Sequence, residues 1–160
     1  MTVELFARML RGGISPDSAL AIVNAALTVR AQEEALATLD VAAFDLLTGQ
    51  VTLLKAGAAE SFYSVGGSVR RVEQPSTPLG ILSSATFART TLQLRGGEIL
   101  AMVSDGVVGC GADEFCRCLR ENRGTPVLED LAAQLLAQAQ AACGADTDDM
   151  TVIVALVEEL

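Results

Sequence analysis

The sequence predicts an α+β fold, in which helices and strands are segregated along the chain. Helical patterns occur at the start of the chain and again just before the last strand, and antiparallel hairpins fill the middle. A regular β-α-β alternation is absent. With 160 residues, 51% of them hydrophobic and 19% charged, the composition predicts one globular domain over residues 1–160.

Two helices are expected at the start of the chain. Residues 2–11 form a short helical pattern that ends at Gly12-Gly13. Ser15-Pro16-Asp17 then predicts a second helix start, with Ser15 as N-cap, proline at the first helical position and an acidic residue in the first turn. An apolar stripe at helical spacing should face the core: Ala19, Ile22, Val23, Ala26 and Leu27.

The middle of the chain reads as strands and turns. Residues 36–46 and 51–57 predict a hairpin around Gly49, and Gly66-Gly67 marks a second hairpin. Further strands are expected at 61–65, 68–72, 86–94, 99–103 and 150–157, and further helices at 112–122 and 128–142.

Charge and composition exclude several classes of function. A net charge of −9 opposes binding to nucleic acid. The absence of histidine excludes Ser-His-Asp triads, Cys-His dyads and histidine-bearing zinc sites. The four cysteines form no C-x-x-C pair, and we expect reduced thiols. No apolar run is long enough to span a bilayer, so this segment should be cytoplasmic and make no membrane contact, whereas a longer parent protein could be anchored.

Carboxylates flank two apolar strands. Asp105 directly follows the strand at 99–103, and Asp148 and Asp149 precede the strand at 150–157. If the two strands are neighbours, Asp105 and Asp148 should face each other, which is favourable only with a cation between them. Oxygen ligands without histidine or cysteine favour Mg²⁺ or Mn²⁺. By spacing alone, the acidic loop could equally be a solvated turn.

Ser104-Asp105-Gly106, followed by Asp148-Asp149-Met150-Thr151-Val152, resembles the last two metal-binding motifs of the metal-dependent, protein phosphatase 2C-like family. Other stretches look like the bacterial branch typified by stage II sporulation protein E: residues 37–40, 44–49, 55–59, 78–81 and 96–100. The resemblance runs in the same order over nearly the whole chain.

This resemblance implies a β-sandwich flanked by helices, in α-β-β-α layers. A complete domain of the family holds two Mn²⁺ or Mg²⁺ ions, which activate a water that attacks phosphoserine or phosphothreonine. By the resemblance, Asp105 and Asp148 are catalytic metal ligands, Gly106 keeps the backbone tight behind Asp105, and Asp149 acts beside the ligands.

The chain also departs from the family pattern. No Asp-Gly precedes Gly12, so the domain is expected to be N-terminally truncated and to lack the first metal motif with its bridging aspartate. One metal ion or none is then expected, with weak or no activity of this chain alone. The alternative is a catalytically inert fragment, or a non-catalytic protein-binding module of the same fold.

The resemblance further implies regulation and partners. Residues 2–30, with Ser15, Asp17 and Asn24 as candidates, are expected to regulate activity. The expected substrate is a phosphorylated regulatory protein, an anti-sigma-factor antagonist. Exposed sheet edges and apolar faces of a truncated sandwich predict a homodimer. Asp40 is expected to be a strand residue at a sheet edge.

Overall fold

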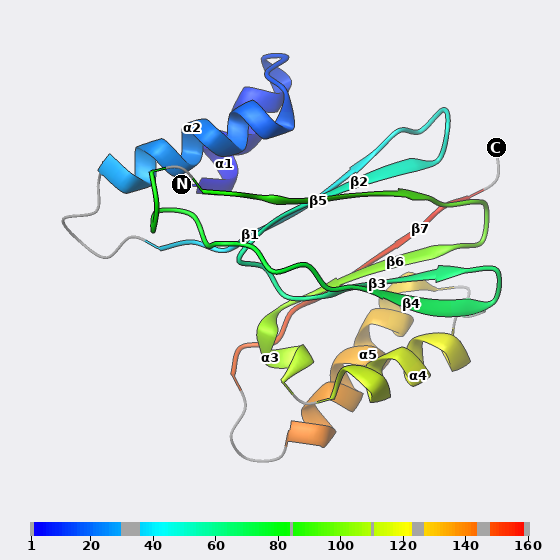
Figure 1. Cartoon of the computed structure of the whole chain (residues 1–160). Coiled ribbons are helices and arrows are strands. Elements are labelled where there is room, and N and C mark those ends of the chain that lie inside the picture. The colour runs from blue at the N-terminus through cyan, green and yellow to red at the C-terminus, as the bar shows by residue number, and fades with distance from the viewer. Residues whose placement is uncertain are drawn as a thin grey trace. The chain divides into compact units, whose positions relative to one another are not determined.

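The computed structural model describes residues 2–29, 36–83, 85–109, 111–122, 127–143 and 148–158 (Figure 1). The chain divides into two compact units, which are treated separately below. Unit 1 contains Met1–Val41, Leu54–Ala58 and Pro75–Arg89, and unit 2 contains Ala42–Leu53, Ala59–Gln74 and Thr90–Leu160.

The elements confirm the predicted α+β class, with two sheets and accompanying helices. In chain order they are α1 (Thr2–Arg11), α2 (Pro16–Val29), β1 (Leu39–Phe44), β2 (Gln50–Ala56), β3 (Ser61–Val65), β4 (Ser68–Val72), β5 (Ala88–Gln93), β6 (Ile99–Val103), α3 (Asp105–Val108), α4 (Ala112–Asn122), α5 (Leu128–Cys143) and β7 (Val152–Leu156). One sheet has the order β1-β2-β5, and the other has the order β4-β3-β6-β7. The short helix α3 was not predicted, because four residues show no periodicity.

Unit 1 is organised around the two N-terminal helices. The Ser15 Oγ accepts a hydrogen bond from the Ser18 N–H at 3.2 Å, which confirms the predicted N-cap of α2. The helices pack on residues of β1 and β2 through a shared apolar cluster: Phe6, Met9, Ala19, Leu20, Val23, Leu27, Leu39, Leu54, Ala56 and Leu79.

The predicted apolar stripe of α2 is wrong at two positions. Ile22 and Ala26 are exposed, whereas Leu20 and Asn24 are buried. The buried face is therefore rotated toward Leu20 relative to the expected one. A pattern of apolar residues could not predict this face of α2, because such a pattern leaves out a buried polar residue such as Asn24.

A buried ion pair joins β1 to β2 in unit 1. The Lys55 side chain is 2% exposed, and its Nζ lies 2.6 Å from the Asp40 Oδ2. A lysine this deeply buried requires a charged partner, because an isolated ammonium is strongly destabilised away from water. Asp40 does lie on an edge strand, as expected, but its role in neutralising Lys55 was not foreseen.

Unit 2 is built on the central strand β6, which pairs antiparallel with both β3 and β7. Alternate residues of β6 face opposite sides of the sheet. Ile99, Ala101 and Val103 join the cluster that α4 and α5 cover, and Figure 1 shows these helices beside this sheet. Leu100 packs on the other side, with residues of β2 and β5. Within unit 2, the sequence thus yields a helix layer on one sheet and a second sheet behind it.

The cysteines differ from the expectation of four reduced thiols. Cys143 is disulfide-bonded, so the expectation is wrong for that residue. Cys116 and Cys118 are free and buried, and burial raises the pKa of both thiols, which keeps them protonated at neutral pH. Cys110 lies outside the described residues.

No helix within the described ranges combines the length and the apolar character needed to cross a membrane.

Replacing Gly57 by alanine should destabilise unit 1 more than the same change at Gly13. Both glycines have positive φ, 63° and 81°, so alanine costs about 1 kcal/mol or more at either site. Only at Gly57 would the new Cβ meet backbone, 2.8 Å from the Pro78 Cα and N. We expect a larger fall in the free energy of unfolding for Gly57→Ala, measured by urea denaturation. Equal effects at both glycines would contradict the close approach.

Candidate active site

The pairing of β6 with β7 brings the two predicted metal-ligand motifs together. Val103 at the end of β6 pairs with Val152 at the start of β7. Asp105 lies two residues beyond this pair, and Asp148 lies four residues before it. The two strands are therefore neighbours, and the two aspartates emerge at the same end of the sheet.

Ser104 fixes the connection between the two motifs. Its N–H donates to the Thr151 carbonyl at 3.1 Å, and its Oγ accepts from the Thr151 N–H at 2.9 Å. The same hydroxyl donates to the Asp149 carbonyl at 3.1 Å. Because these bonds occupy it, Ser104 makes no side-chain cap for α3, although it stands at the N-cap position.

Gly106 allows the two backbones to approach closely. A Cβ at this position would lie 2.7 Å from the Asp149 carbonyl oxygen and 3.3 Å from that of Asp148. No side chain fits in that space without moving the loop. Gly106 thus holds the start of α3 against residues 148–149.

The two aspartates present carboxylate oxygens to solvent. Both residues are exposed. The Asp105 Oδ1 accepts from the Gly106 N–H at 3.1 Å, and the Asp148 Oδ1 accepts from the Asp149 N–H at 2.8 Å. These bonds orient each carboxylate. They engage only one of its two oxygens with donors among the described residues.

This donor set fits a hard cation. Mg²⁺ in particular is often held by one or two carboxylates and completes its octahedron with water. The described residues contain no group of three or more His, Cys, Asp or Glu side chains that could hold a metal. Asp146 lies outside the described residues.

The candidate regulatory residues lie in unit 1, and each has a structural contact there. Ser15 caps α2, and the Asp17 Oδ2 lies 2.7 Å from the Arg89 Nη1 in an exposed ion pair. Asn24 is 2% exposed. Its Oδ1 accepts from the Gly80 N–H at 3.0 Å, and its Nδ2 donates to the Leu82 carbonyl at 2.8 Å. Asn24 therefore ties α2 to the loop that follows Leu79.

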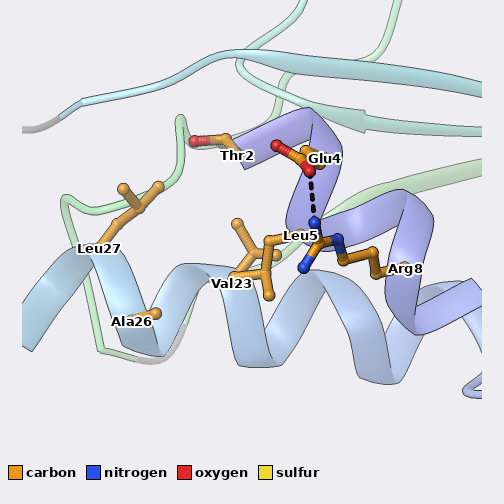
Figure 2. Close-up of a pocket in the computed structure, with 7 residues that line it drawn as sticks. All are labelled: Thr2, Glu4, Leu5, Arg8, Val23, Ala26 and Leu27. Atoms are coloured by element: carbon orange, nitrogen blue, oxygen red, sulfur yellow. Dashed lines mark hydrogen bonds and ion pairs between the residues drawn. The ribbon is translucent and has the colours of Figure 1, made fainter.

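A groove of about 330 Å³ lies between α1 and α2 in unit 1 (Figure 2). The Glu4–Arg8 ion pair, 2.7 Å long, borders it on α1. Its lining is mostly apolar: Thr2, Glu4, Leu5, Arg8, Val23, Ala26 and Leu27. Sequence reasoning missed this groove, because it placed Ala26 in the buried stripe of α2, whereas the exposed Ala26 lines the groove.

Solved structures define the class of protein. The chain superimposes on a structure of the PP2C phosphatase domain with a fragment of the regulatory domain of SpoIIE from Bacillus subtilis, with a TM-score of 0.78 and 27% identity. The match covers 96% of this chain and 47% of that one. The phosphatase domain of the same protein, presoaked with Mn, gives a TM-score of 0.65 and 26% identity over 99% of this chain and 73% of that one. The fold is that of a PP2C-type serine/threonine phosphatase domain.

The family follows from the sequence match. Residues 1–158 match the family described as stage II sporulation protein E (SpoIIE), and the chain belongs to this family. Stage II sporulation protein E of Bacillus subtilis (strain 168) is 32% identical over 106 residues. That stretch is 66% of this chain but 13% of the length of the relative.

Replacing Gly106 by alanine should weaken metal binding without unfolding the protein. The new Cβ would push the carbonyls of Asp148 and Asp149 away and so separate the two carboxylates. We expect the affinity for Mn²⁺ to fall about tenfold, comparable to the loss of a group that orients a ligand. Titration calorimetry with Mn²⁺ measures it. Gly109→Ala on the same segment is the matched control, because a Cβ there would lie 3.5 Å from the nearest atom. Unchanged affinity in Gly106→Ala would contradict the proposed role.

Proposed function

We propose that the chain forms part of a metal-dependent phosphatase that hydrolyses phosphoserine or phosphothreonine on a regulatory protein. The observation that supports this most is the convergence of Asp105 and Asp148 at one end of the β6–β7 pair, within a chain of the SpoIIE family. Mn²⁺ and Mg²⁺ are the proposed cofactors. The Mn-presoaked structure of the Bacillus subtilis domain supports the first of these.

In this proposal the chain's own residues bind and orient the cofactor. Asp105 and Asp148 supply carboxylate oxygens, and the Gly106 and Asp149 N–H groups hold those carboxylates in place. Ser104 keeps the two motifs in register through its bonds to Thr151 and Asp149. A bound ion lowers the pKa of water and offsets charge on the phosphoryl oxygens.

The proposed substrate is a phosphorylated anti-sigma-factor antagonist, and the proposed location is the cytoplasm, where such a regulator meets its target. Membership in a sporulation family supports a regulatory substrate. A net charge of −9 argues against nucleic acid as a partner.

A homodimer is proposed as well, through the surface of α1 and α2. Exposed apolar side chains gather on these helices: Val3, Leu5, Ile22 and Val29. Burying them against a second copy would remove apolar area from water. The molar mass of a monomer over a wide concentration range in light scattering would exclude this dimer.

A second candidate function is a non-catalytic binding module. The groove between α1 and α2 and the absence of a three-ligand cluster among the described residues favour it. In that case the fold is kept, metal binding is weak, and the helices make the functional contacts.

Activity and metal binding together separate these two functions. We expect Mn²⁺-dependent release of phosphate from a phosphoserine peptide, and a fall of about tenfold or more in Mn²⁺ affinity for Asp105→Asn and Asp148→Asn. Asp130→Asn on α5, an exposed aspartate with the same change of charge, is the control and should behave as the unaltered chain. Calorimetry gives the Mn²⁺ affinity independently of turnover.

Each outcome has a definite meaning. Mn²⁺ binding that depends on both aspartates, without phosphate release, would favour the inert or binding form of the fold. Phosphate release that persists in Asp105→Asn would overturn the proposed site.

We propose a regulatory role for residues 2–30, with Asn24 as the contact through which α2 acts on the loop after Leu79. Asn24→Ala leaves the Gly80 N–H and the Leu82 carbonyl without their partner, which should lower the free energy of unfolding by about 2 kcal/mol. It should also change the rate of phosphate release while leaving Mn²⁺ affinity intact. Asn122→Ala is the control, because among the described residues that amide bonds within α4, to Cys118. A fall in stability with no change in rate would reject regulation through Asn24.

A further inference from the structure

Cys143 lies at the junction of the two segments that carry the proposed metal ligands. It is the last residue of α5, and it precedes Asp148 by five residues. Its Sγ lies 3.8 Å from the carbonyl oxygen of Gly106, the residue that follows Asp105. One sulfur therefore contacts the backbone of the first ligand segment and belongs to the stretch of chain that leads into the second.

The segment that Cys143 contacts depends on tertiary packing. α3 consists of four residues, and a helix of one turn is not stable by itself. Ser104 supplies no side-chain cap. Val107 packs in the cluster that α4 and α5 cover, and the Gly109 N–H donates to the Asp105 carbonyl at 2.9 Å. The position of Asp105 therefore depends on how firmly α3 is held against its neighbours.

The sulfur of Cys143 differs in chemical state from those of α4. Cys143 is disulfide-bonded and half-buried. Cys116 and Cys118 are free and buried, and burial raises the pKa of both thiols, so they stay protonated and shielded. Small thiols exchange with a disulfide where they can reach a sulfur. Among the described cysteines, Cys143 alone combines an oxidised sulfur with partial access to solvent.

The disulfide changes what this sulfur does to its surroundings. A cross-link restrains the backbone next to it, here the end of α5 and the chain toward Asp148. It also keeps Sγ against the Gly106 carbonyl, because a cross-linked side chain does not change rotamer freely. A free cysteine at a helix end has neither restraint. Disulfides that meet cytoplasmic thiols are usually transient or redox-sensing, and the cytoplasm is the location proposed above.

We propose that the disulfide of Cys143 is a redox switch, which holds the Gly106 segment and the approach to Asp148 in place and so raises the affinity for the metal ion. The switch rests on the metal site proposed above. Its reductant is a small thiol: one thiolate attacks the disulfide and releases a cysteine thiolate, and a second thiolate attacks the resulting mixed disulfide. Two small thiols thereby become one disulfide, and the two cysteine thiolates take up the protons that those thiols lost.

The test compares the whole chain with its disulfide intact and after reduction by dithiothreitol and desalting under nitrogen. Mass spectrometry of an unreduced digest verifies the disulfide and identifies the partner of Cys143. Calorimetry should give an affinity for Mn²⁺ about tenfold lower in the reduced chain, comparable to the loss of a group that orients a ligand. Without metal, amide hydrogen exchange at Val107 and Gly109 should be faster in the reduced chain, whereas exchange at Ile99 should not change.

Matched cysteine variants attribute the effect to Cys143. Cys143→Ala should bind Mn²⁺ as weakly as the reduced chain, both before and after treatment with dithiothreitol. Cys116→Ala, which removes a free and buried thiol, should keep the full difference between the two forms. If Cys143→Ala does not fold, the comparison of the two forms of the unaltered chain still decides, because it needs no substitution.

Equal Mn²⁺ affinity in the two forms, or equal exchange at Val107 and Gly109, would overturn the switch. So would a digest in which Cys143 is a free thiol before reduction. Faster exchange on reduction with no Mn²⁺ binding in either form would overturn the proposed metal site, and control of its affinity with it, while the effect of the disulfide on α3 would stand.

Discussion

The antiparallel register between β6 and β7 is the constraint on which the candidate site depends. It sets Val103 opposite Val152, and this single pairing decides that Asp105 and Asp148 leave the sheet at the same end. A slip of one residue would turn Ile153 and its neighbours to the opposite faces and would break the bonds of Ser104 to Thr151. The apolar contacts of Val152, Val154 and Leu156 with the cluster under α4 and α5 stabilise the register from one side.

Polar groups that are buried but paired hold unit 1 in one arrangement. Lys55 and Asp40 neutralise each other between β1 and β2, and Asn24 satisfies two backbone groups of the loop after Leu79. Apolar packing tolerates small shifts, whereas a buried hydrogen bond is lost when its partner moves by an ångström. We infer that these contacts define the position of α2 more sharply than the surrounding leucines do.

The proposed metal site depends on the backbone around Gly106 as well as on the carboxylates. Metal binding by Asp105 and Asp148 requires exposed, oriented oxygens, and the close backbone approach at Gly106 provides the orientation.

The sequence by itself determined the class of fold, the strands at 61–65, 68–72 and 99–103, and the two aspartate motifs. Local rules suffice for these features: glycine pairs mark hairpins, Ser15 and Pro16 mark a helix start, and apolar runs mark buried strands. Tertiary structure decided what such rules cannot see. It selected the face of α2 that buries Asn24 and exposes Ile22, paired Lys55 with Asp40, folded Asp105 into α3, and bonded Cys143 in a disulfide. Each of these features depends on contacts with residues that are distant in the sequence. Only the folded chain brings such residues within contact distance.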